Sequence, residues 1–412
     1  MGDTKTLRVQ NLGPIQEAEV VFGDLTVLVG PQASGKSIFM QLLKVLLDYG
    51  PIREEFKRFG IDWQKRWENF LELYFGEGMS EIYRESAEEQ GAESEIREGA
   101  ERPAGTLIQW NQSVIRLSEL LTRRIREQEE QMFYIPAQRV LALRDGLTRP
   151  FTDYRAGDPF VVREFAEKIH QLVQSEFATK EELFPQERRL KSEYREILNQ
   201  HIFAGFGLRT EMERFQRRLV LKSPTGRSLS FLVWSAGQRE FVPLLLGLYW
   251  LIPPTKKSRR GRVEWVAIEE LEMGLHPVAI SAVMVLVLEL LHRGYRVVLS
   301  THSPHILDVV WALQIMQSHQ GRPANVLRMF SLPSTGPLRE LAEDALKKTY
   351  RVYYFRRDGK VVDITGLNPG APSEDEAGWG GLTEFSGKVG DIIAEVVRQA
   401  ESQEALGGEN GK

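Results

Sequence analysis

The chain has 412 residues, of which 42% are hydrophobic and 27% are charged, a composition typical of a globular protein and not of a disordered or fibrous one. Its 53 Lys and Arg residues against 57 Asp and Glu residues give a net charge of -4, which excludes a global basic field that would draw the whole protein onto nucleic acid. The absence of cysteine excludes disulfides, thiolate metal sites and cysteine nucleophiles.

Residues 7–29 predict three strands at the start of the chain. Apolar and polar residues alternate around two turns, Gly13-Pro14 and Gly23-Asp24, and the segment then ends in a solid apolar run. This pattern predicts two antiparallel strands followed by a buried strand. Apolar residues at helical spacing over residues 37–47 predict a helix next, so the Gly-rich segment between them lies where a strand becomes a helix.

That Gly-rich segment matches the phosphate-loop pattern G-x-x-x-x-G-K-[ST]. It reads Gly30-Pro31-Gln32-Ala33-Ser34-Gly35-Lys36-Ser37. The glycines let backbone N–H groups curve around phosphate oxygens at a helix N-terminus, Lys36 reaches the β and γ phosphates, and Ser37 offers its hydroxyl to Mg2+. We predict that all eight residues bind ATP and that Lys36 also takes part in catalysis.

The middle of the chain carries weaker signals. Residues 76–105 are rich in Glu, Gly, Ser and Ala, which predicts a mobile surface excursion. We assign residues 1–150 to the N-terminal lobe of a head domain. Dense charge with helical periodicity then predicts a helical insertion over residues 151–218.

Strands and helices alternate in the second half of the sequence, which predicts a mainly parallel sheet and an α/β fold. The predicted strands cover residues 219–221, 263–268 and 296–300, and the predicted helices cover residues 237–251 and 277–292. We assign residues 219–310 to a C-terminal lobe, residues 311–400 to an α/β extension with a hairpin at Asp358-Gly359, and residues 401–412 to a disordered tail.

We expect a cytoplasmic protein with no membrane partner. The longest apolar run, residues 241–252, is too short to span a bilayer. The first ten residues lack the apolar core of a signal peptide.

Two buried strands end in residues that could act on a phosphate. The first, within residues 263–272, ends in acids, and we assign Glu269 to Mg2+ and Glu270 to the orientation or deprotonation of water. Without the phosphate loop upstream, a solvated acidic strand end would be an equally good interpretation. The second ends in His302, which can bond a γ-phosphate and sense its loss. Its place at the carboxyl end of a strand favours this role over that of an ordinary surface histidine.

A fourth motif, Ser235-Ala236-Gly237-Gln238, precedes the predicted helix at residues 237–251. A Ser and a Gly at a helix N-terminus can bind phosphate, but most such pairs only cap the helix. By itself the motif is a weak signal.

The four motifs, in the order phosphate loop, Ser-x-Gly-Gln, acidic strand and strand-His, resemble the ABC-type ATPases of the SMC, RecF and OLD (overcoming lysogenization defect) group. The resemblance covers about residues 7–310, and the segments IEELEMGLHP and LSTHSPHIL are most similar to the OLD-like branch. It implies a P-loop NTPase fold, an ABC-type ATPase head that holds ATP and Mg2+ between two subunits and hydrolyses ATP to ADP and phosphate.

The resemblance also implies roles for individual residues. Ser235, Gly237 and Gln238 would form the signature motif, which closes on ATP held by a second subunit. Residues 274–277 would form the loop that crosses the dimer, Glu270 the catalytic carboxylate and His302 the switch histidine. Gln138, after an apolar strand, would be the Q-loop residue that ligates Mg2+, although one glutamine after a strand is also typical of an exposed loop.

The sequence departs from this group at three points. Gln32 stands where the group commonly has Asn, and Glu269 stands where Asp is commoner. OLD nucleases carry a C-terminal Toprim domain with an Asp-x-Asp pair, and no Asp-x-Asp follows His302 here. We therefore assign no nuclease activity to this chain.

The resemblance suggests a sensor or regulatory ATPase subunit of a prokaryotic anti-phage defence complex, a homodimer or higher oligomer with a separately encoded effector nuclease. One alternative is a RecF-like or SMC-like DNA repair ATPase that clamps DNA directly. Another is a nucleotide-dependent assembly scaffold with little turnover. The basic segment at residues 256–262 could contact DNA non-specifically, but such a run is also typical of a solvated linker.

Overall fold

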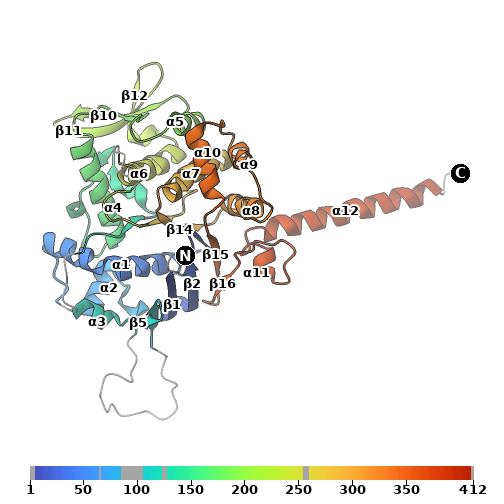
Figure 1. Cartoon of the computed structure of the whole chain (residues 1–412), viewed down its shortest axis with the longest axis horizontal. Coiled ribbons are helices and arrows are strands. Elements are labelled where there is room, and N and C mark those ends of the chain that lie inside the picture. The colour runs from blue at the N-terminus through green and yellow to red at the C-terminus, as the bar shows by residue number, and fades with distance from the viewer. Residues whose placement is uncertain (1–4, 65, 85–104, 123–127, 254–258, 410–412) are drawn as a thin grey trace, which may run out of the picture.

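A six-stranded sheet forms the centre of the computed structural model, which describes residues 5–64, 66–84, 105–122, 128–253 and 259–409. The strand order is β16-β15-β3-β14-β13-β6, and Figure 1 labels β14, β15 and β16 of this sheet. All neighbouring strands are parallel except β15 and β16. The strands are β3 (Leu25–Val29), β6 (Met132–Ile135), β13 (Trp265–Glu269), β14 (Arg296–Thr301), β15 (Tyr350–Phe355) and β16 (Val361–Asp363). The predicted α/β fold with a mainly parallel sheet is confirmed.

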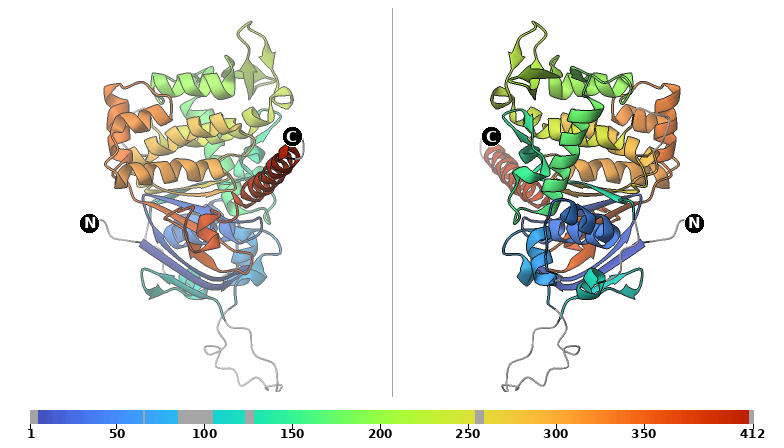
Figure 2. Two further views of the ribbon diagram at one scale, coloured as in Figure 1. Left: turned by 90° about the vertical axis from the view of Figure 1, so that its right-hand side faces the viewer. Right: turned by 90° about the vertical axis from the view of Figure 1, so that its left-hand side faces the viewer.

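A second, antiparallel sheet lies on one side of the central sheet, in the order β2-β1-β4-β5. Its strands are β1 (Lys5–Leu12), β2 (Ile15–Phe22), β4 (Leu107–Trp110) and β5 (Ser113–Val114). Helix α1 (Lys36–Arg58) lies between the two sheets, because Phe39 and Leu43 share one buried cluster with Leu7 of β1 and with Val298 of β14 (Figure 2). The predicted N-terminal antiparallel strands are confirmed.

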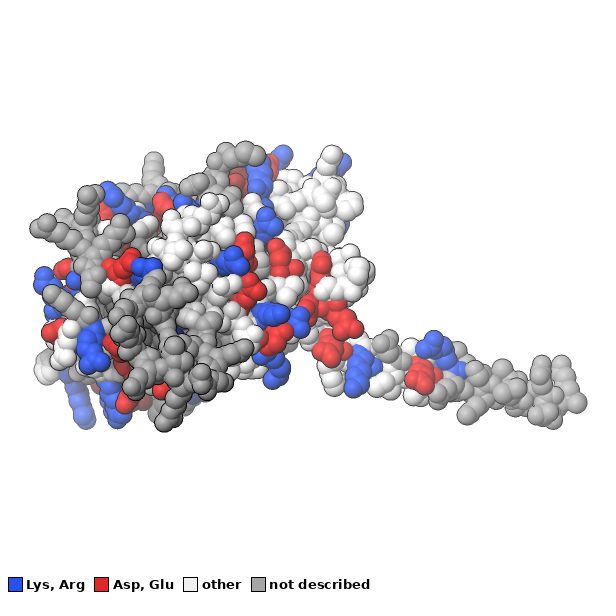
Figure 3. Space-filling model, turned by 90° about the horizontal axis from the view of Figure 1, so that it is seen from below, with Lys and Arg blue, Asp and Glu red and all other residues white. Residues whose placement is uncertain are grey.

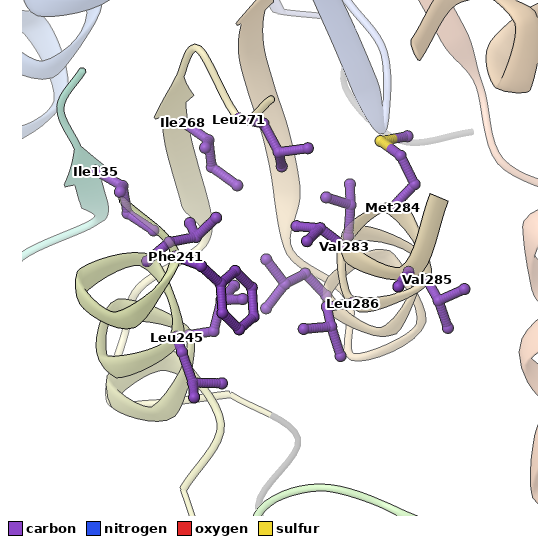
Figure 4. Close-up of a cluster of buried hydrophobic side chains, with 14 of the residues drawn as sticks. Ile135, Phe241, Leu245, Ile268, Leu271, Val283, Met284, Val285 and Leu286 are labelled. Carbon is purple, nitrogen blue, oxygen red and sulfur yellow. The ribbon is translucent and has the colours of Figure 1, made fainter. Parts of the chain in front are cut away.

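Two apolar helices, α6 (Ala236–Leu251) and α7 (Pro277–His292), cover the other face of the central sheet. Their side chains belong to a second buried cluster, in which Phe241 of α6 and Val283 of α7 point toward each other beneath Ile268 of β13 (Figure 4). A helix that is apolar on all sides has to be buried, and both helices have additional helices outside them. These outer helices include α4 (Phe160–Gln171), α5 (Ser192–Leu198), α8 (Pro304–Ser318), α9 (Pro323–Met329) and α10 (Gly336–Ala345).

The predicted helical insertion at residues 151–218 is helical only in part. It contains α4 and α5, but its last residues form the antiparallel hairpin of β10 (Gly207–Glu213) and β11 (Gln216–Lys222). The hairpin turns at Arg214 and Phe215, which have φ of 47° and 69°. Such two-residue turns usually contain Asn-Gly or another glycine pair, so the sequence lacks the expected turn signal. The strands belong to a third sheet with β7 (Leu143–Arg144), β8 (Leu147–Thr148), β9 (Glu182–Phe184) and β12 (Ser228–Leu229).

The predicted C-terminal extension, residues 311–400, is part of the head itself. Strand β15 pairs in parallel with β3, with Val352 opposite Val27, and so extends the central sheet. The predicted hairpin is confirmed, since β15 and β16 are antiparallel and Phe355 pairs with Val361 across the turn at Asp358 and Gly359. The assignment of this region to a separate extension was therefore wrong. The sequence did not indicate the pairing, because β3 and β15 are more than 300 residues apart.

Helix α12 (Glu384–Glu409) follows the short α11 (Glu374–Ala377) and ends the described chain. The predicted disordered tail at 401–412 is wrong for residues 401–409, which continue α12, and residues 410–412 lie outside the described residues. Residues 85–104, which make up most of the predicted excursion at residues 76–105, also lie outside the described residues. None of the helices within the described ranges is long and apolar enough to cross a membrane.

A buried charge cluster joins α1 to β6 and α4. Lys44 Nζ lies 2.7 Å from the carbonyl oxygen of Met132 and 3.1, 3.0 and 3.3 Å from carboxylate oxygens of Asp48, Glu164 and Glu130. Burial alone would lower the pKa of Lys44, but the three carboxylates together raise it well above its usual value. The lysine therefore stays charged and holds three acids together.

We expect Lys44→Met to lower the free energy of unfolding by about 3–5 kcal/mol, because the buried Asp48 would lose its cation, while Glu130 and Glu164 would keep only their contacts with Lys168. Denaturation in urea at pH 7 measures this loss. Lys57→Met is the matched control, since Lys57 lies on the exposed surface of the same helix, 3.9 Å from Glu54, and should leave the midpoint unchanged. Equal midpoints for both variants would contradict the assignment.

Candidate nucleotide-binding site

The phosphate loop connects β3 to α1 and is confined between the two sheets. Gly30 and Gly35 have φ of 143° and 97°. A Cβ on Gly30 would lie 2.3 Å from the carbonyl oxygen of Phe355, and a Cβ on Gly35 would lie 2.6 Å from Cγ1 of Ile15. Both positions therefore require glycine on grounds of space as well as conformation.

The ammonium group of Lys36 lies inside this loop. Its Nζ donates to the carbonyl oxygens of Gly30 at 2.8 Å and Pro31 at 2.7 Å, and lies 3.4 Å from Ser34 Oγ. Burial lowers the pKa of Lys36 to about 8, against the opposing effect of the nearby glutamates, so the group remains mostly cationic at pH 7. Ser37 follows in the first turn of α1 and is exposed. The unpaired N–H groups of that turn complete an anion-binding helix N-terminus.

The parallel sheet brings the predicted motifs to one edge. Strand β14 lies between β3 and β13, with Thr301 paired to Val29 and Ser300 paired to Glu269. Strand β6 lies on the far side of β13 and ends next to Ile268. The phosphate loop, His302, the two glutamates and Gln138 therefore follow the carboxyl ends of four adjacent strands, where open α/β sheets bind ligands.

Glu269 ends β13 with a buried side chain held by β6 and the loop that follows it. Its Oε1 accepts a hydrogen bond from the Tyr134 hydroxyl at 2.6 Å, and its Oε2 accepts one from the Ala137 N–H at 2.9 Å. Each carboxylate oxygen has a second lone pair, so these bonds leave room for a metal ion. The role of Glu269 as a Mg2+ ligand stays a prediction.

Glu270 is the more open of the two carboxylates. It has a φ of 43°, and its N–H donates to the carbonyl oxygen of Ser300 at 3.0 Å, which holds this left-handed conformation. Its side chain is 35% exposed, and its Oε1 lies 3.8 Å from Nε2 of His302. Burial, and then the charge of Lys36, lower the pKa of His302, so the imidazole is neutral at pH 7. An open carboxylate beside a neutral imidazole can orient a water molecule.

Glu272 also belongs to this edge, although we did not select it from the sequence. Its Oε1 accepts hydrogen bonds from the His302 N–H at 2.6 Å and from the Thr301 hydroxyl at 2.9 Å. Within the part of the chain that the structure describes, its Oε2 is buried without a hydrogen-bond partner. The available signal was its position as the third acid in Glu-Glu-Leu-Glu, two residues after Glu270.

Arg139 connects three segments of the site and was also missed. Its guanidinium is 1% exposed and donates to the carbonyl oxygens of Glu269 at 2.9 Å, Glu270 at 3.0 Å and Glu240 of α6 at 3.2 Å. Its neighbour Gln138 lies at the same edge with an exposed side chain, so its metal-ligating role stays a prediction. The signal that could have identified Arg139 is its position directly after Gln138.

The Ser-x-Gly-Gln motif caps α6. The Gln238 N–H donates to Ser235 Oγ at 3.2 Å, and the Ser235 N–H donates to Gln238 Oε1 at 3.1 Å. A Cβ on Gly237 would lie 2.9 Å from the carbonyl oxygen of Gly274, so this glycine packs against the loop after β13. Ser235 and Gln238 therefore form a capping box at the N-terminus of α6. The role of Ser235, Gly237 and Gln238 as a signature motif stays a prediction.

The oxygen atoms that the protein offers at this site would need the phosphate oxygens of a nucleotide beside them to bind Mg2+. Among the described residues, no group of three or more His, Asp or Glu side chains could hold a metal ion by itself. Ser37, Glu269 and Gln138 offer a hydroxyl, a carboxylate and an amide oxygen, and Mg2+ is commonly held by one or two protein groups plus phosphate oxygens. The donor chemistry therefore fits a Mg-nucleotide complex.

The basic segment at residues 256–262 is only partly described, because residues 256–258 lie outside the described residues. Arg260 pairs with Glu176 at 2.5 Å, and Arg262 lies 3.4 Å from Glu129. Arg259 Nη1 donates to the carbonyl oxygen of Gly294 at 3.3 Å. These contacts favour the linker interpretation over a phosphate-binding surface.

Comparison with known families supports the nucleotide-binding interpretation. Residues 150–308 match the family described as "AAA domain, putative AbiEii toxin, Type IV TA system". The matched segment contains the Ser-x-Gly-Gln motif, the acidic end of β13 and His302. This part of the chain is therefore similar to an AAA-type ATPase domain. The match covers less than half of the chain and begins after the phosphate loop.

Three solved structures are similar to this chain at low sequence identity. An SMC head domain from Thermotoga maritima is 15% identical, with a TM-score of 0.28 over 74% of this chain and 91% of that chain. An Smc head bound to the C-terminal winged-helix domain of ScpA is 12% identical, with a TM-score of 0.41 over 87% and 97%. An Smc head with an extended coiled coil, bound to the C-terminal domain of ScpA derived from Pyrococcus furiosus, is 12% identical, with a TM-score of 0.35 over 87% and 96%. No curated protein matches the chain.

Proposed function

We propose that this protein binds ATP and Mg2+ at the carboxyl edge of its central sheet, dimerises around them and hydrolyses ATP. The observation that carries the proposal is that Lys36 in the phosphate loop, Glu270 and His302 follow the carboxyl ends of three adjacent parallel strands, β3, β13 and β14. A cation, an open carboxylate and a neutral imidazole at one helix N-terminus are what phosphoryl transfer to water requires.

The residues would divide the chemistry among them. The N–H groups at the start of α1 and the ammonium of Lys36 would bind the phosphates, with Lys36 exchanging its carbonyl partners for phosphate oxygens. Ser37, Glu269 and Gln138 would hold Mg2+, which neutralises charge on the transferred phosphate. Glu270 would orient the attacking water, and His302 would contact the γ-phosphate.

Dimerisation is supported by the surface around the Ser-x-Gly-Gln motif. Leu232 and Val233 precede Ser235 and are more than 60% exposed, and Val278 at the start of α7 is also exposed. Exposed apolar side chains just before α6 and in the first turn of α7 suit contact with a second subunit. In such a homodimer, Ser235, Gly237 and Gln238 would close on ATP held by the other copy.

In the cell we propose an OLD-like sensor or regulatory subunit of an anti-phage defence complex, with the nuclease on a separate chain. The family that matches residues 150–308 includes a toxin of toxin–antitoxin systems in its description, which is compatible with a defence role. The paired arginines at residues 259–262 speak against direct clamping of DNA by that segment.

Trapping the ATP-bound state tests the proposal. We expect ATP and Mg2+ to increase the mass of the Glu270→Gln assembly, and to leave the mass of the double variant Lys36→Ala/Glu270→Gln unchanged. Light scattering gives the mass, and mass spectrometry identifies what is bound. A co-purified nuclease supports the defence role, and salt-resistant DNA alone would support a DNA clamp. Assembly that ATP drives equally well in wild type, with negligible turnover, would support a scaffold.

A further inference from the structure

Helix α12 carries an apolar surface that the rest of the described chain does not cover. The helix projects away from the body (Figures 1 and 3). Six apolar side chains of this helix are between 41% and 77% exposed: Phe385, Val389, Ile392, Ile393, Val396 and Val397. A continuous exposed apolar surface of this kind on a projecting element indicates an interface.

Four of these residues have the spacing of a coiled-coil seam. Phe385, Val389, Ile392 and Val396 are separated by four, three and four residues, as at alternating d and a positions of a heptad. Gly387 and Gly390 lie inside the same stretch, and a Cβ on either would meet nothing within 4 Å. Interior glycines weaken an isolated helix, so α12 needs a packing partner to be stable in water.

We propose that this partner is α12 of a second copy of the chain, packed in the antiparallel direction. The charges beside the seam are complementary only in that arrangement. Lys388 and Glu395 each come directly before an a position, at Val389 and Val396. When Val389 packs against Ile392 of the second copy, Lys388 faces Glu395 of the second copy, and twofold symmetry repeats the pair.

A parallel pair does not use these charges. There, Lys388 would face Ile393 of the second copy, and the heptad position opposite Glu395 is not a basic residue in the sequence, so the second copy would offer neither of them an opposite charge. The antiparallel pair also places Phe385 against Val396 of the second copy, which covers the seam from end to end. This contact requires no nucleotide and is thus independent of the ATP-dependent dimer proposed above.

Sedimentation of the nucleotide-free full chain tests the pairing, in a Lys36→Ala background that removes any ATP-driven assembly. We expect a concentration-dependent dimer, and we expect Ile392→Glu to raise its dissociation constant at least about tenfold by placing an unpaired charge in the seam. Ala394→Glu is the matched control, since Ala394 is exposed on the opposite side of the same turn, and should change nothing. A monomer at all concentrations, or equal effects of both variants, would overturn the proposal.

Charge reversal tests the direction of the pairing. Lys388→Glu and Glu395→Lys should each weaken the dimer, because each places like charges at positions 388 and 395 of the two copies. The double variant should restore the dimer, because these two positions then carry opposite charges again. The absence of cysteine allows a covalent check: Val389→Cys/Ile392→Cys should give a disulfide-linked dimer on mild oxidation, and Ala394→Cys should not. If the double variant does not restore the dimer, the antiparallel pair is excluded. An unchanged thermal midpoint would show that the body is folded in every variant.

Discussion

Glu270→Gln is expected to lower the rate of ATP hydrolysis at least about 100-fold, the usual contribution of a positioned general base. Glutamine keeps the size of the side chain and its left-handed backbone but cannot take a proton from water. ATP binding should stay close to wild type, because Lys36 and the N-terminus of α1 are unchanged. Phosphate release measures the rate, and the binding of a fluorescent ATP analogue measures affinity.

Two comparisons make that result specific. Glu264→Gln removes an exposed carboxylate just before β13 and should leave the rate unchanged. Lys36→Ala should weaken nucleotide binding itself, since it removes the cation of the phosphate loop. Hydrolysis at the wild-type rate in Glu270→Gln would show that another group orients the water, with Glu272 as the next candidate at this edge.

Arg139→Met is expected to lower the free energy of unfolding by about 3–5 kcal/mol, because it removes the hydrogen bonds of a buried guanidinium to the carbonyl oxygens of Glu269, Glu270 and Glu240. Arg139→Lys is the more informative variant. It keeps the charge but loses the planar fork that reaches Glu269, Glu270 and Glu240 together. We expect it to fold, to bind ATP with similar affinity, and to hydrolyse ATP about tenfold or more slowly, because the carbonyl group of Glu270 loses its hydrogen bond to the guanidinium and the carboxylate is positioned less firmly.

The separation of kcat from KM distinguishes positioning from a general loss of structure. A residue that only stabilises the fold would change thermal stability without changing kcat of the folded fraction. Arg144→Met is the control, since Arg144 is exposed in β7, a few residues further along the chain, and should change neither quantity. Wild-type kcat in a folded Arg139→Lys protein would refute the positioning role.

Features that depend on neighbouring residues were predictable from the sequence. The phosphate loop needs glycines at fixed offsets and a strand and a helix around it, and all of these lie within 40 residues. The limits of α7 agree with the prediction, because Pro277 suits the first turn of a helix and the apolar run ends at His292. The order of motifs along parallel strands was enough to predict that Glu269, Glu270 and His302 share an edge.

Contacts between distant segments were decided by the tertiary structure. The hydrogen bonds of Arg139 to Glu269, Glu270 and Glu240 join residues more than 100 positions apart, and no local pattern specifies which carbonyl groups a buried guanidinium will meet. Glu272 became part of the site because the chain turns after β13 and returns its carboxylate to the His302 N–H.

The same distinction explains the errors in the fold. Strand β15 joins the central sheet beside β3, and its Phe355 carbonyl forces glycine at position 30, yet nothing near residue 355 indicates this neighbour. The β10–β11 hairpin has charged residues on its exposed side and a turn without glycine, so its pattern resembles a polar helix. The sequence by itself determined the local elements and the chemistry they carry, because these depend on short-range sterics and hydrophobic period. Only the tertiary structure decided which buried polar groups pair, because that depends on which distant backbone groups the packed sheets leave without partners.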